Sequence, residues 1–566
     1  MISILKETRV VGHGALLALV VFAASCDRRQ DLAPTGPVSG IARNVGPAAA
    51  HVRPAEAPFA ELSKMVPSSA GFIYDPAGNI VVFVRESAEM PGAAHALSAL
   101  VSSKRINLRA DRRQMPAVIV KRADFTFQQL AAWRDTVGNY IDNTAGIGVV
   151  SLDLNEGTNR LTVGVRTSAN RQQLLSAFAA LAVDTKAVEF ETAAGFGFLS
   201  RTVTPRDAVA RSTAAAASMS LQSIQANASQ LVGGLSIGIA RSDGRGQCTL
   251  SFAAREYQNG ITTTGFLTAS HCTQNLFAYD GDAFYQATFG SFVGNEKDDP
   301  QGYRCGIYNC NVADATFVQT TPGTNVGLGL IAKGAGGLQY DTSDLWIVTQ
   351  AEHNDVYLGQ PFSWVGQTSG FHTDIITNTC VDFWHNYDFP SFSEYKTTCE
   401  EMTSGTAQGG DSGGTVYIPL GTGNEVEAVG MISGNYFNTS GKMCFTRVSR
   451  IQANFATENG TIYFGPPSPP SPTITLTGTL NGSSNPSLAW TAYPGALNYN
   501  LYRKDVDGGC TDLGTTLLYS GTSTSYVDWN MTGGGITLCP SSQYYVVATT
   551  SNSVQESNNV VFAPPQ

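Results

Sequence analysis

Charged residues are scarce in this chain, and none of them gather into a basic tract. Asp, Glu, Lys and Arg make up 14% of the 566 residues, and the formal net charge is -10. A protein that binds nucleic acid through its charge carries basic patches and a positive balance. We therefore expect no nucleic-acid partner. The 42% of apolar residues also excludes a largely disordered chain, because disordered segments lack apolar residues.

Motifs for metals and cofactors are missing as well. The ten cysteines form no CxxC pair and the seven histidines are scattered, which argues against a structural zinc site. No HExxH, Walker or dinucleotide-binding pattern occurs. We predict no metal site and no required cofactor. One cysteine is Cys26 and the other nine lie between Cys248 and Cys539, which favours disulfides in an oxidising compartment.

The N-terminus has only a short apolar run, Gly14–Ser25, which is too short to span a bilayer as a helix. A basic start and small residues at its end are typical of a signal peptide, which we assign to residues 1–26. The residues Ala23–Cys26 resemble a bacterial lipoprotein processing site, without the usual leucine. A lipid anchor on Cys26 and ordinary secretion both stay open.

The remaining chain divides into four segments. Residues 27–227 begin as a tether rich in Pro, Ala and Gly, and then alternate expected strands and helices, which predicts an α+β domain. In residues 228–464, short apolar runs are broken by turn residues about every ten positions, the pattern of a β-barrel or sandwich. Residues 465–472 are a stiff Pro-rich linker. Residues 473–566 predict a separate β-sandwich.

Local patterns predict individual elements. Strands are expected at 80–84, 117–120, 149–154, 160–165, 187–191, 487–492, 498–503, 525–528 and 544–549, and helices at 127–140, 170–181 and 448–457. The stretch 213–230 has small residues and no charge, so it predicts an exposed, cleavable joint or else a short Ala-rich helix. Cleavage within 227–231 would separate the first domain from the second.

Three short motifs carry the chemistry. The sequences GFLTASHC, NVADATFV and GGDSGGTV contain His271, Asp314 and Ser412. A serine hydroxyl is a weak nucleophile until a base removes its proton, and an imidazole titrates near neutrality. A buried carboxylate would hold that imidazole in the required tautomer. Each motif alone is usually structural, but together they predict a catalytic triad.

LTASHC and GDSGG resemble the histidine and serine motifs of the chymotrypsin family, especially its bacterial branch of alpha-lytic protease and streptogrisins. The order of the three residues is the family's, and their separations of 43 and 98 positions are similar to its spacing. Leu231–Gly234, Val365–Gly370 and Met431–Gly434 resemble further family segments. The resemblance implies a mainly β fold: a chymotrypsin-like double β-barrel, preceded by an α+β pro-region and followed by a β-sandwich. It also implies a secreted serine endopeptidase that works through an acyl-enzyme.

The resemblance assigns further roles. The N–H groups of Gly410 and Ser412 would form an oxyanion hole. The substrate pocket would contain Thr406, Ala407, Ile432, Ser433 and Gly434. Trypsin-like members have an acidic residue where this chain has Thr406, so cleavage after Lys or Arg is disfavoured. A small to medium apolar pocket and an acid-selective pocket stay open. Ser433 would also hydrogen-bond Asp314, and the family's frequent cysteine beside the pocket is Gln408 here.

Four disulfides follow from the family pattern and from spacing: Cys248–Cys272, Cys305–Cys310, Cys380–Cys399 and Cys510–Cys539. They leave Cys444 without a partner.

The α+β segment resembles bacterial pro-regions, which act as an intramolecular chaperone and inhibitor. Residues 1–227 hold 23 basic and 18 acidic residues, whereas residues 228–566 hold 12 and 27, so opposite net charges would aid docking. An unrelated accessory domain stays open for this segment. The last segment resembles a fibronectin type III module, with Trp490 on one strand and Tyr544 near another, for binding or spacing.

The sequence therefore predicts a monomeric zymogen whose substrates are proteins or peptides. The alternative is an inactive homologue that serves as a surface binding or adhesion protein. Inactive homologues typically lose a triad residue, and none is lost here.

Overall fold

The computed structural model describes most of the chain from residue 53 onwards. The described residues are 53–103, 106, 116–199, 201–203, 221–241, 244–258, 261–287, 289–351, 356–385, 395–421, 423–438, 441–458, 460–464, 474–480, 485–492, 496–506, 512–528, 542–549, 554–556 and 560–562. The predictions for the signal peptide, Cys26, the linker 465–472 and the Cys510–Cys539 disulfide lie outside these residues. Residues 49–566 cluster as one compact unit.

The N-terminal region is α+β, as its alternating pattern predicts. Its elements are η1 (Pro54–Glu56), α1 (Ala57–Met65), β1 (Ser69–Tyr74), β2 (Ile80–Val84), α2 (Met90–Ser102), β3 (Val118–Arg122), α3 (Phe127–Asp142), β4 (Val149–Asn155), β5 (Arg160–Val165), α4 (Ser168–Ala180), η2 (Thr185–Ala187), β6 (Val188–Thr192) and β7 (Gly195–Phe198). The strands and helices expected between residues 80 and 191 are confirmed, with ends that differ by no more than two residues. Helix α3 begins at a capping box, in which Thr126 accepts from the N–H of Gln129 and the Gln129 side chain accepts from the N–H of Thr126.

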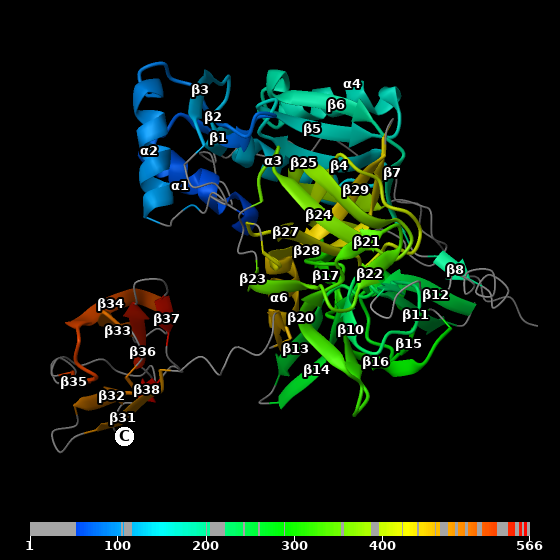
Figure 1. Ribbon diagram of the computed structural model, residues 1–566. Coiled ribbons are helices and arrows are strands. Elements are labelled where there is room, and N and C mark those ends of the chain that lie inside the picture. Colours follow the sequence, from blue (N-terminus) through cyan, green and yellow to red (C-terminus); the bar gives the residue numbers. More distant parts are fainter. Residues whose placement is uncertain are drawn as a thin grey trace, which may run out of the picture. The chain divides into compact units, whose positions relative to one another are not determined.

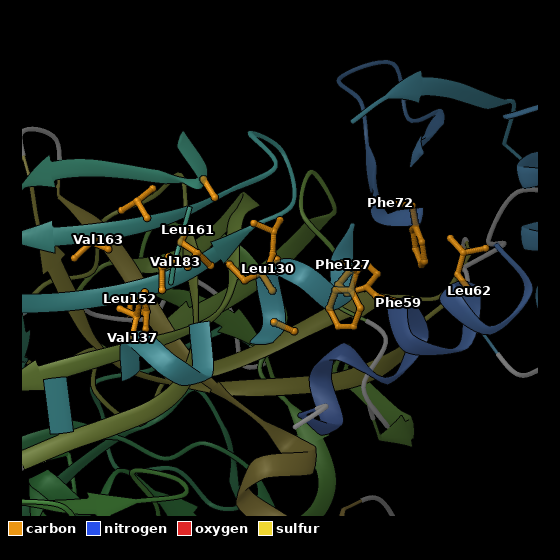
Figure 2. Packing of buried hydrophobic residues seen from close by; sticks show 14 of the residues in the cluster. Phe59, Leu62, Phe72, Phe127, Leu130, Val137, Leu152, Leu161, Val163 and Val183 are labelled. Atoms are coloured by element: carbon orange, nitrogen blue, oxygen red, sulfur yellow. The ribbon is translucent and has the colours of Figure 1, made fainter. Parts of the chain in front are cut away.

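Apolar side chains from α3 and the β4–β5 hairpin form much of the core of this region. Figure 2 shows Leu130 and Val137 of α3 close to Leu152, Leu161 and Val163 of the two strands. All five are buried. The i, i+7 spacing of the two helix residues puts both on one face, and the alternation along β5 points Leu161 and Val163 to the same side. Their burial fixes how α3 lies on the sheet.

Two large sheets make up the central region. The nine-stranded sheet has the order β30-β13-β14-β19-β16-β15-β11-β12-β8, and its strands are β8 (Arg201–Val203), β11 (Ser236–Arg241), β12 (Gly244–Thr249), β13 (Ala253–Gln258), β14 (Ile261–Thr268), β15 (Ala283–Gln286), β16 (Phe292–Asp298), β19 (Thr316–Thr320) and β30 (Gly460–Phe464). All of its pairings are antiparallel, and three of them (β11–β12, β13–β14 and β15–β16) join strands that are consecutive in the chain.

The second sheet has 15 strands and includes β4 to β7 of the N-terminal region. Its other strands are β10 (Leu231–Gly233), β17 (Tyr303–Cys305), β18 (Tyr308–Asn311), β20 (Val326–Ile331), β23 (Trp346–Ala351), β24 (Pro361–Gly366), β25 (Gly370–His385), β26 (Tyr395–Thr403), β27 (Thr415–Pro419), β28 (Glu425–Phe437) and β29 (Lys442–Arg447). A small sheet joins β9 (Leu221–Ser223), β22 (Gln339–Asp341) and β21 (Gly334–Gly336). Helix α6 (Val448–Ala456) confirms the helix expected near residue 450.

Backbone pairing joins the N-terminal region to the central sheets at several places. Strand β4 pairs with β25, and the cyan strands β5 and β6 in Figure 1 continue the sheet beyond β4. Strand β7 pairs with β28. The two strands that follow β7 in the chain also pair with the central region, β8 with β12 and β9 with β22. Because β9 is a paired strand, residues 221–223 are not the exposed joint that their composition predicts.

The C-terminal segment forms two small antiparallel sheets. One contains β31 (Leu476–Leu480), β32 (Pro486–Trp490) and β35 (Ser525–Val527), and the other contains β33 (Asn498–Val506), β34 (Asp512–Gly521), β36 (Ser542–Thr549), β37 (Val554–Glu556) and β38 (Val560–Phe562). Trp490 and Tyr544 lie in their shared apolar core, and the four strands expected from the sequence are confirmed.

Candidate functional site

His271, Asp314 and Ser412 come together although they lie far apart in the sequence. His271 sits in the short helix η3 (Ser270–Cys272) directly after β14, and Asp314 lies just before β19, which pairs with β14. The His271 Nδ1 atom is 2.6 Å from Asp314 Oδ2, and His271 Nε2 is 2.7 Å from Ser412 Oγ. The backbone N–H of His271 also donates to Asp314 Oδ1 at 3.0 Å. The carboxylate therefore fixes both the position and the ring orientation of the histidine.

Glycines around Ser412 let its loop pass close to neighbouring backbone. Gly413 has φ +78°, and a Cβ there would lie 2.3 Å from Thr249 O and 2.4 Å from Thr268 Oγ1. Gly410 has φ +100°, a conformation that residues with a Cβ rarely adopt. Backbone geometry thus requires two glycines of the GGDSGG motif, Gly410 and Gly413.

The carboxylate of Asp411, beside Ser412, is held mainly by the turn that follows β24, a partner that no sequence pattern assigns. Its Oδ1 accepts from the N–H groups of Thr368 and Ser369, at 2.8 and 2.9 Å. Its Oδ2 accepts from the N–H of Gln408 at 2.8 Å. These bonds anchor the serine loop to the turn after β24, a segment whose sequence does resemble a family turn.

The backbone N–H of Gly410 donates to the carbonyl oxygen of Leu199 at 2.8 Å. Gly410 is the predicted oxyanion-hole donor, and here it binds a peptide carbonyl of the chain's own N-terminal region. A donor in this position would stabilise negative charge that develops on a carbonyl oxygen during attack by Ser412.

A side chain at Gly410 is expected to disturb this donor. The added Cβ in Gly410→Ala would lie 2.2 Å from Gln367 Nε2 and 2.6 Å from Thr368 Oγ1, so the loop would have to shift. We expect kcat/KM for a peptide substrate to fall by about 100-fold, because small displacements of a catalytic donor are costly. The control is Gly421→Ala, where φ is +69° but no atom lies within 4 Å. Equal activities of the two variants would contradict the role of Gly410.

Three of the predicted pocket residues differ in burial. Ala407 and Ile432 are buried in one apolar cluster with Leu199, whereas Thr406 is exposed. The loop before Ser412 is tied to β28 by Asn435, whose side chain accepts from the N–H of Ala407 at 3.2 Å and donates to the carbonyl of Ala407 at 2.8 Å. This amide ties β28 to the residue beside Gln408, the position where the family frequently has a cysteine.

Ser433 does not bond Asp314 as the sequence resemblance implied. Its hydroxyl donates to Glu400 at 2.7 Å, and Glu400 also accepts from the Thr446 hydroxyl at 2.7 Å. The pKa of Glu400 is raised to about 7. Burial is the main cause and the charge of Asp314 adds to it, while the two hydroxyl donors act in the opposite direction. No local motif marks Glu400, because its importance depends on strand β26 lying beside β29.

Strand β7 lies along β28 next to the triad. Its register pairs Phe198 with Gly434 and Gly197 with Asn435. A Cβ at Gly434 would lie 2.5 Å from both Gly197 O and Phe196 Cζ, so a glycine is needed where the strand crosses. Ser412 has no exposed surface, and the Phe198 ring of β7 lies against the His271 imidazole, with centroids 4.6 Å apart. The N-terminal region therefore covers His271 beside Ser412.

The described residues contain three disulfides, Cys248–Cys272, Cys305–Cys310 and Cys380–Cys399, as the sequence predicts. The first joins β12 to η3 and so holds the segment that carries His271. Cys444 is buried and forms no disulfide among the described residues. Within those same ranges, no group of three or more His, Cys, Asp or Glu could hold a metal ion. No helix in the described part of the chain is both long and apolar enough to cross a membrane.

Comparison with known proteins gives similarity only to solved structures, since no family model and no curated protein matches the chain. A glutamic acid-specific serine protease is 20% identical with a TM-score of 0.29, and the match covers 41% of this chain and 100% of that one. A Nocardiopsis protease is 21% identical with a TM-score of 0.28, covering 41% and 98%. A chymotrypsin from Cellulomonas bogoriensis is 23% identical with a TM-score of 0.28, covering 42% and 99%.

Proposed function

We propose that this chain is a secreted serine endopeptidase with a chymotrypsin-like double β-barrel, made as an inactive precursor. Ser412 Oγ attacks the carbonyl carbon of a peptide bond, while His271 accepts its proton and then gives it to the leaving amine. Asp314 stabilises the imidazolium that forms between these steps. Gly410 N–H, and by prediction Ser412 N–H, bind the oxygen of the tetrahedral intermediate. Water then hydrolyses the acyl-enzyme by the same route.

The observation that carries the proposal is the chain of two short contacts through His271. Hydrogen-bond distances of 2.6 and 2.7 Å link carboxylate, imidazole and hydroxyl in the order that activates a serine. A site that serves only to bind a partner has no need for this alignment. Since the hydroxyl and the carboxylate lie at opposite ends of one buried imidazole, proton transfer needs no rearrangement.

A fluorophosphonate probe tests the proposal directly, since it reacts with serines activated in this way. The chain, after removal of its N-terminal region, should be labelled, and peptide mapping should find the label on Ser412. Heat-unfolded chain is the control and should stay unlabelled. A processed, folded chain that takes up no label would instead favour an inactive homologue used for surface binding.

The precursor role of the N-terminal region is supported by contacts around its edge. The Arg53 guanidinium pairs with Asp382 at 2.8 Å, and Lys396 pairs with Asp142 at 3.0 Å. In the first pair the N-terminal region supplies the cation, and in the second it supplies the anion. Docking therefore does not depend simply on the opposite net charges of the two parts. Burial alone would raise the pKa of Asp382, but the charges of Arg53 and Lys396 outweigh it and hold this pKa well below its usual range.

Two buried carboxyl groups of the hairpin β4–β5 oppose docking at high pH. Burial raises the pKa of Asp153 to about 7, and burial with the charge of Asp153 raises the pKa of Glu156 well above its usual value. Asp153 accepts from Asn378 at 2.7 Å, and Glu156 accepts from Thr379, both in β25. The docked state thus retains protons that separated parts would release.

These two carboxyl groups should weaken docking as the pH rises from about 4 to 7, because the docked state holds protons on them that the separated parts have released. In a chain cleaved between the two parts, the double variant Asp153→Asn/Glu156→Gln should bind at least about tenfold more tightly than wild type at pH 8. At pH 4 the two should bind alike. Dissociation followed by size-exclusion chromatography measures this. Burial lowers the pKa of His385 in β25 and so acts in the opposite direction, but His385 is present in both proteins, so the difference between them reports the two carboxyl groups.

The control for this comparison is Glu86→Gln/Glu189→Gln, which changes two exposed carboxylates of the same region. It should leave the pH dependence as in wild type. A double variant at Asp153 and Glu156 that dissociates as wild type does at both pH values would contradict the prediction.

We also propose that the last segment is a fibronectin type III-like module for binding or spacing. Secretion of the chain is in keeping with its three disulfides, which persist in oxidising compartments.

A further inference from the structure

We propose that the bond between Leu199 and Ser200 is the first bond that this enzyme cuts, in its own chain. We further propose that its cleft selects an aromatic residue followed by leucine on the acyl side. Both statements rest on the proposed function. The sequence had directed attention to 227–231, where the composition suggests a cleavable joint.

The backbone on both sides of this bond is held by the two large sheets. On the acyl side, β7 pairs with β28, with Phe198 opposite Gly434 and Gly197 opposite Asn435. Beyond the bond, β8 pairs with β12, with Arg201 opposite Gln247. Between these two pairings, the Leu199 carbonyl oxygen accepts from Gly410 N–H at 2.8 Å. Extended backbone fixed on both sides of a carbonyl in the oxyanion site is the arrangement that a substrate must adopt.

The side chains on the acyl side are also matched to their surroundings. Leu199 is 8% exposed and shares an apolar cluster with Ala407 and Ile432. The Phe198 ring stacks on the His271 imidazole, with centroids 4.6 Å apart and planes at 22°. It also stacks on His385, at 5.0 Å and 7°. His385 comes from the end of β25, so a strand outside the triad would contribute to selection of the penultimate residue.

Phe196 adds a second aromatic contact two residues earlier. Its ring lies 5.0 Å from Phe383 and 4.9 Å from His385, and its side chain is largely buried. Phe196 and Phe198 are separated by Gly197, and both rings contact His385. A peptide Phe-Gly-Phe-Leu therefore carries the side chains that contact His271, His385 and Phe383 and the leucine that packs with Ala407 and Ile432.

The alternative junction is bound elsewhere. The N–H of Ala228 donates to Gln286, and the N–H of Leu231 donates to the carbonyl of Asn325. Leu231 is buried and begins β10, which pairs with β20. These bonds keep residues 228–231 within the central sheets, so the triad has no access to them in this arrangement.

The chemistry follows the proposed mechanism and needs only water besides the chain. Ser412 Oγ forms a bond to the Leu199 carbonyl carbon, and its proton moves to His271. The bond from that carbon to the Ser200 nitrogen breaks, and His271 protonates the nitrogen to give a new amino terminus. Water then attacks the Leu199 ester, releasing a carboxylate and restoring the Ser412 hydroxyl. Strands β8 and β9, paired with β12 and β22, would remain with the protease.

The time course of processing tests this assignment. The full chain is sampled from the start of folding, and the first new N-terminus is identified by sequencing and mass spectrometry. We expect it at Ser200, with no processing of Ser412→Ala. The change Leu199→Asp should slow the first cut at least tenfold, whereas Leu181→Asp, an exposed leucine in the same region, should not. A first N-terminus within 227–231, or unchanged processing of Leu199→Asp, would overturn the proposal.

Peptide substrates keep the test independent of how these variants fold. The processed enzyme should hydrolyse the p-nitroanilide of Phe-Gly-Phe-Leu with a kcat/KM at least tenfold above those of Phe-Gly-Phe-Lys, Phe-Gly-Phe-Glu and Phe-Gly-Gly-Leu. A preference for the glutamate peptide would instead indicate an acid-selective pocket and overturn the inferred selectivity. If Ser412 reacts with fluorophosphonate but cutting starts elsewhere, only this inference fails. If the processed chain neither reacts nor cuts any peptide, the proposed function itself fails.

Discussion

Replacing Ser412 with alanine is expected to lower kcat for a peptide substrate by on the order of 10⁶-fold. The change removes the atom that forms the acyl-enzyme and leaves the binding strand β28 intact. The change Asp314→Asn should lower turnover by about 10⁴-fold, because the amide no longer holds the productive tautomer of His271. The double variant should be no slower than Ser412→Ala, since the two residues act on one proton transfer. Steady-state kinetics measures all three variants after added wild-type enzyme has removed their N-terminal regions and has been separated from them, because Ser412→Ala should not process itself.

The proteins must fold alike for these losses to be read as chemistry. Asp314 is fully buried and accepts two bonds from His271, so an asparagine there keeps the shape but changes the bonding. Near-ultraviolet circular dichroism and the midpoint of thermal unfolding should show the same fold as in wild type. Losses that simply add in the double variant would argue that the residues act independently, which the geometry at His271 does not allow.

Much of the fold could be predicted because its signals are local. The apolar alternation at 160–165 and the helical spacing after Thr126 depend only on neighbouring residues, and β5 and α3 begin at the predicted residues. The proximity of His271, Asp314 and Ser412 could also be predicted, because each residue lies in a short motif and the three motifs together resemble those of one family.

Features that depend on pairing between distant strands could not be predicted. The carboxylate of Asp411 accepts from Thr368 and Ser369, which lie 43 and 42 positions earlier in the chain. Glu400 of β26 accepts from the Ser433 hydroxyl of β28, and β29 lies between these two strands. Leu199 enters the site only because β7 pairs with β28. Composition predicts a joint near residue 227 because composition reports local polarity. Which backbone segment lies beside Ser412 is decided instead by the pairing register of the strands.

Removing residues 27–199 from the gene, with the signal peptide kept, is expected to lower the yield of active enzyme by on the order of 100-fold. Sheets rich in long-range pairs fold slowly and expose edges while they do so. Here the N-terminal region pairs with both β25 and β28. The indole of Trp384 is buried in the core of that region and donates to Asp142 at 2.9 Å. Without the region, this strand end and its apolar surface would be open during folding.

The control is deletion of residues 465–566, which removes two sheets with an apolar core of their own. That deletion should leave the yield of active enzyme near that of the full chain, measured as fluorophosphonate-reactive protein per total protein. Enzyme produced from the full chain should stay active after it has lost its N-terminal region. In the proposed function, this region is needed while the chain folds and blocks the site afterwards. Equal yields from the two deletions would show that the N-terminal region covers the site without assisting folding. The pairing of β4 with β25 and of β7 with β28 would then contribute only to inhibition.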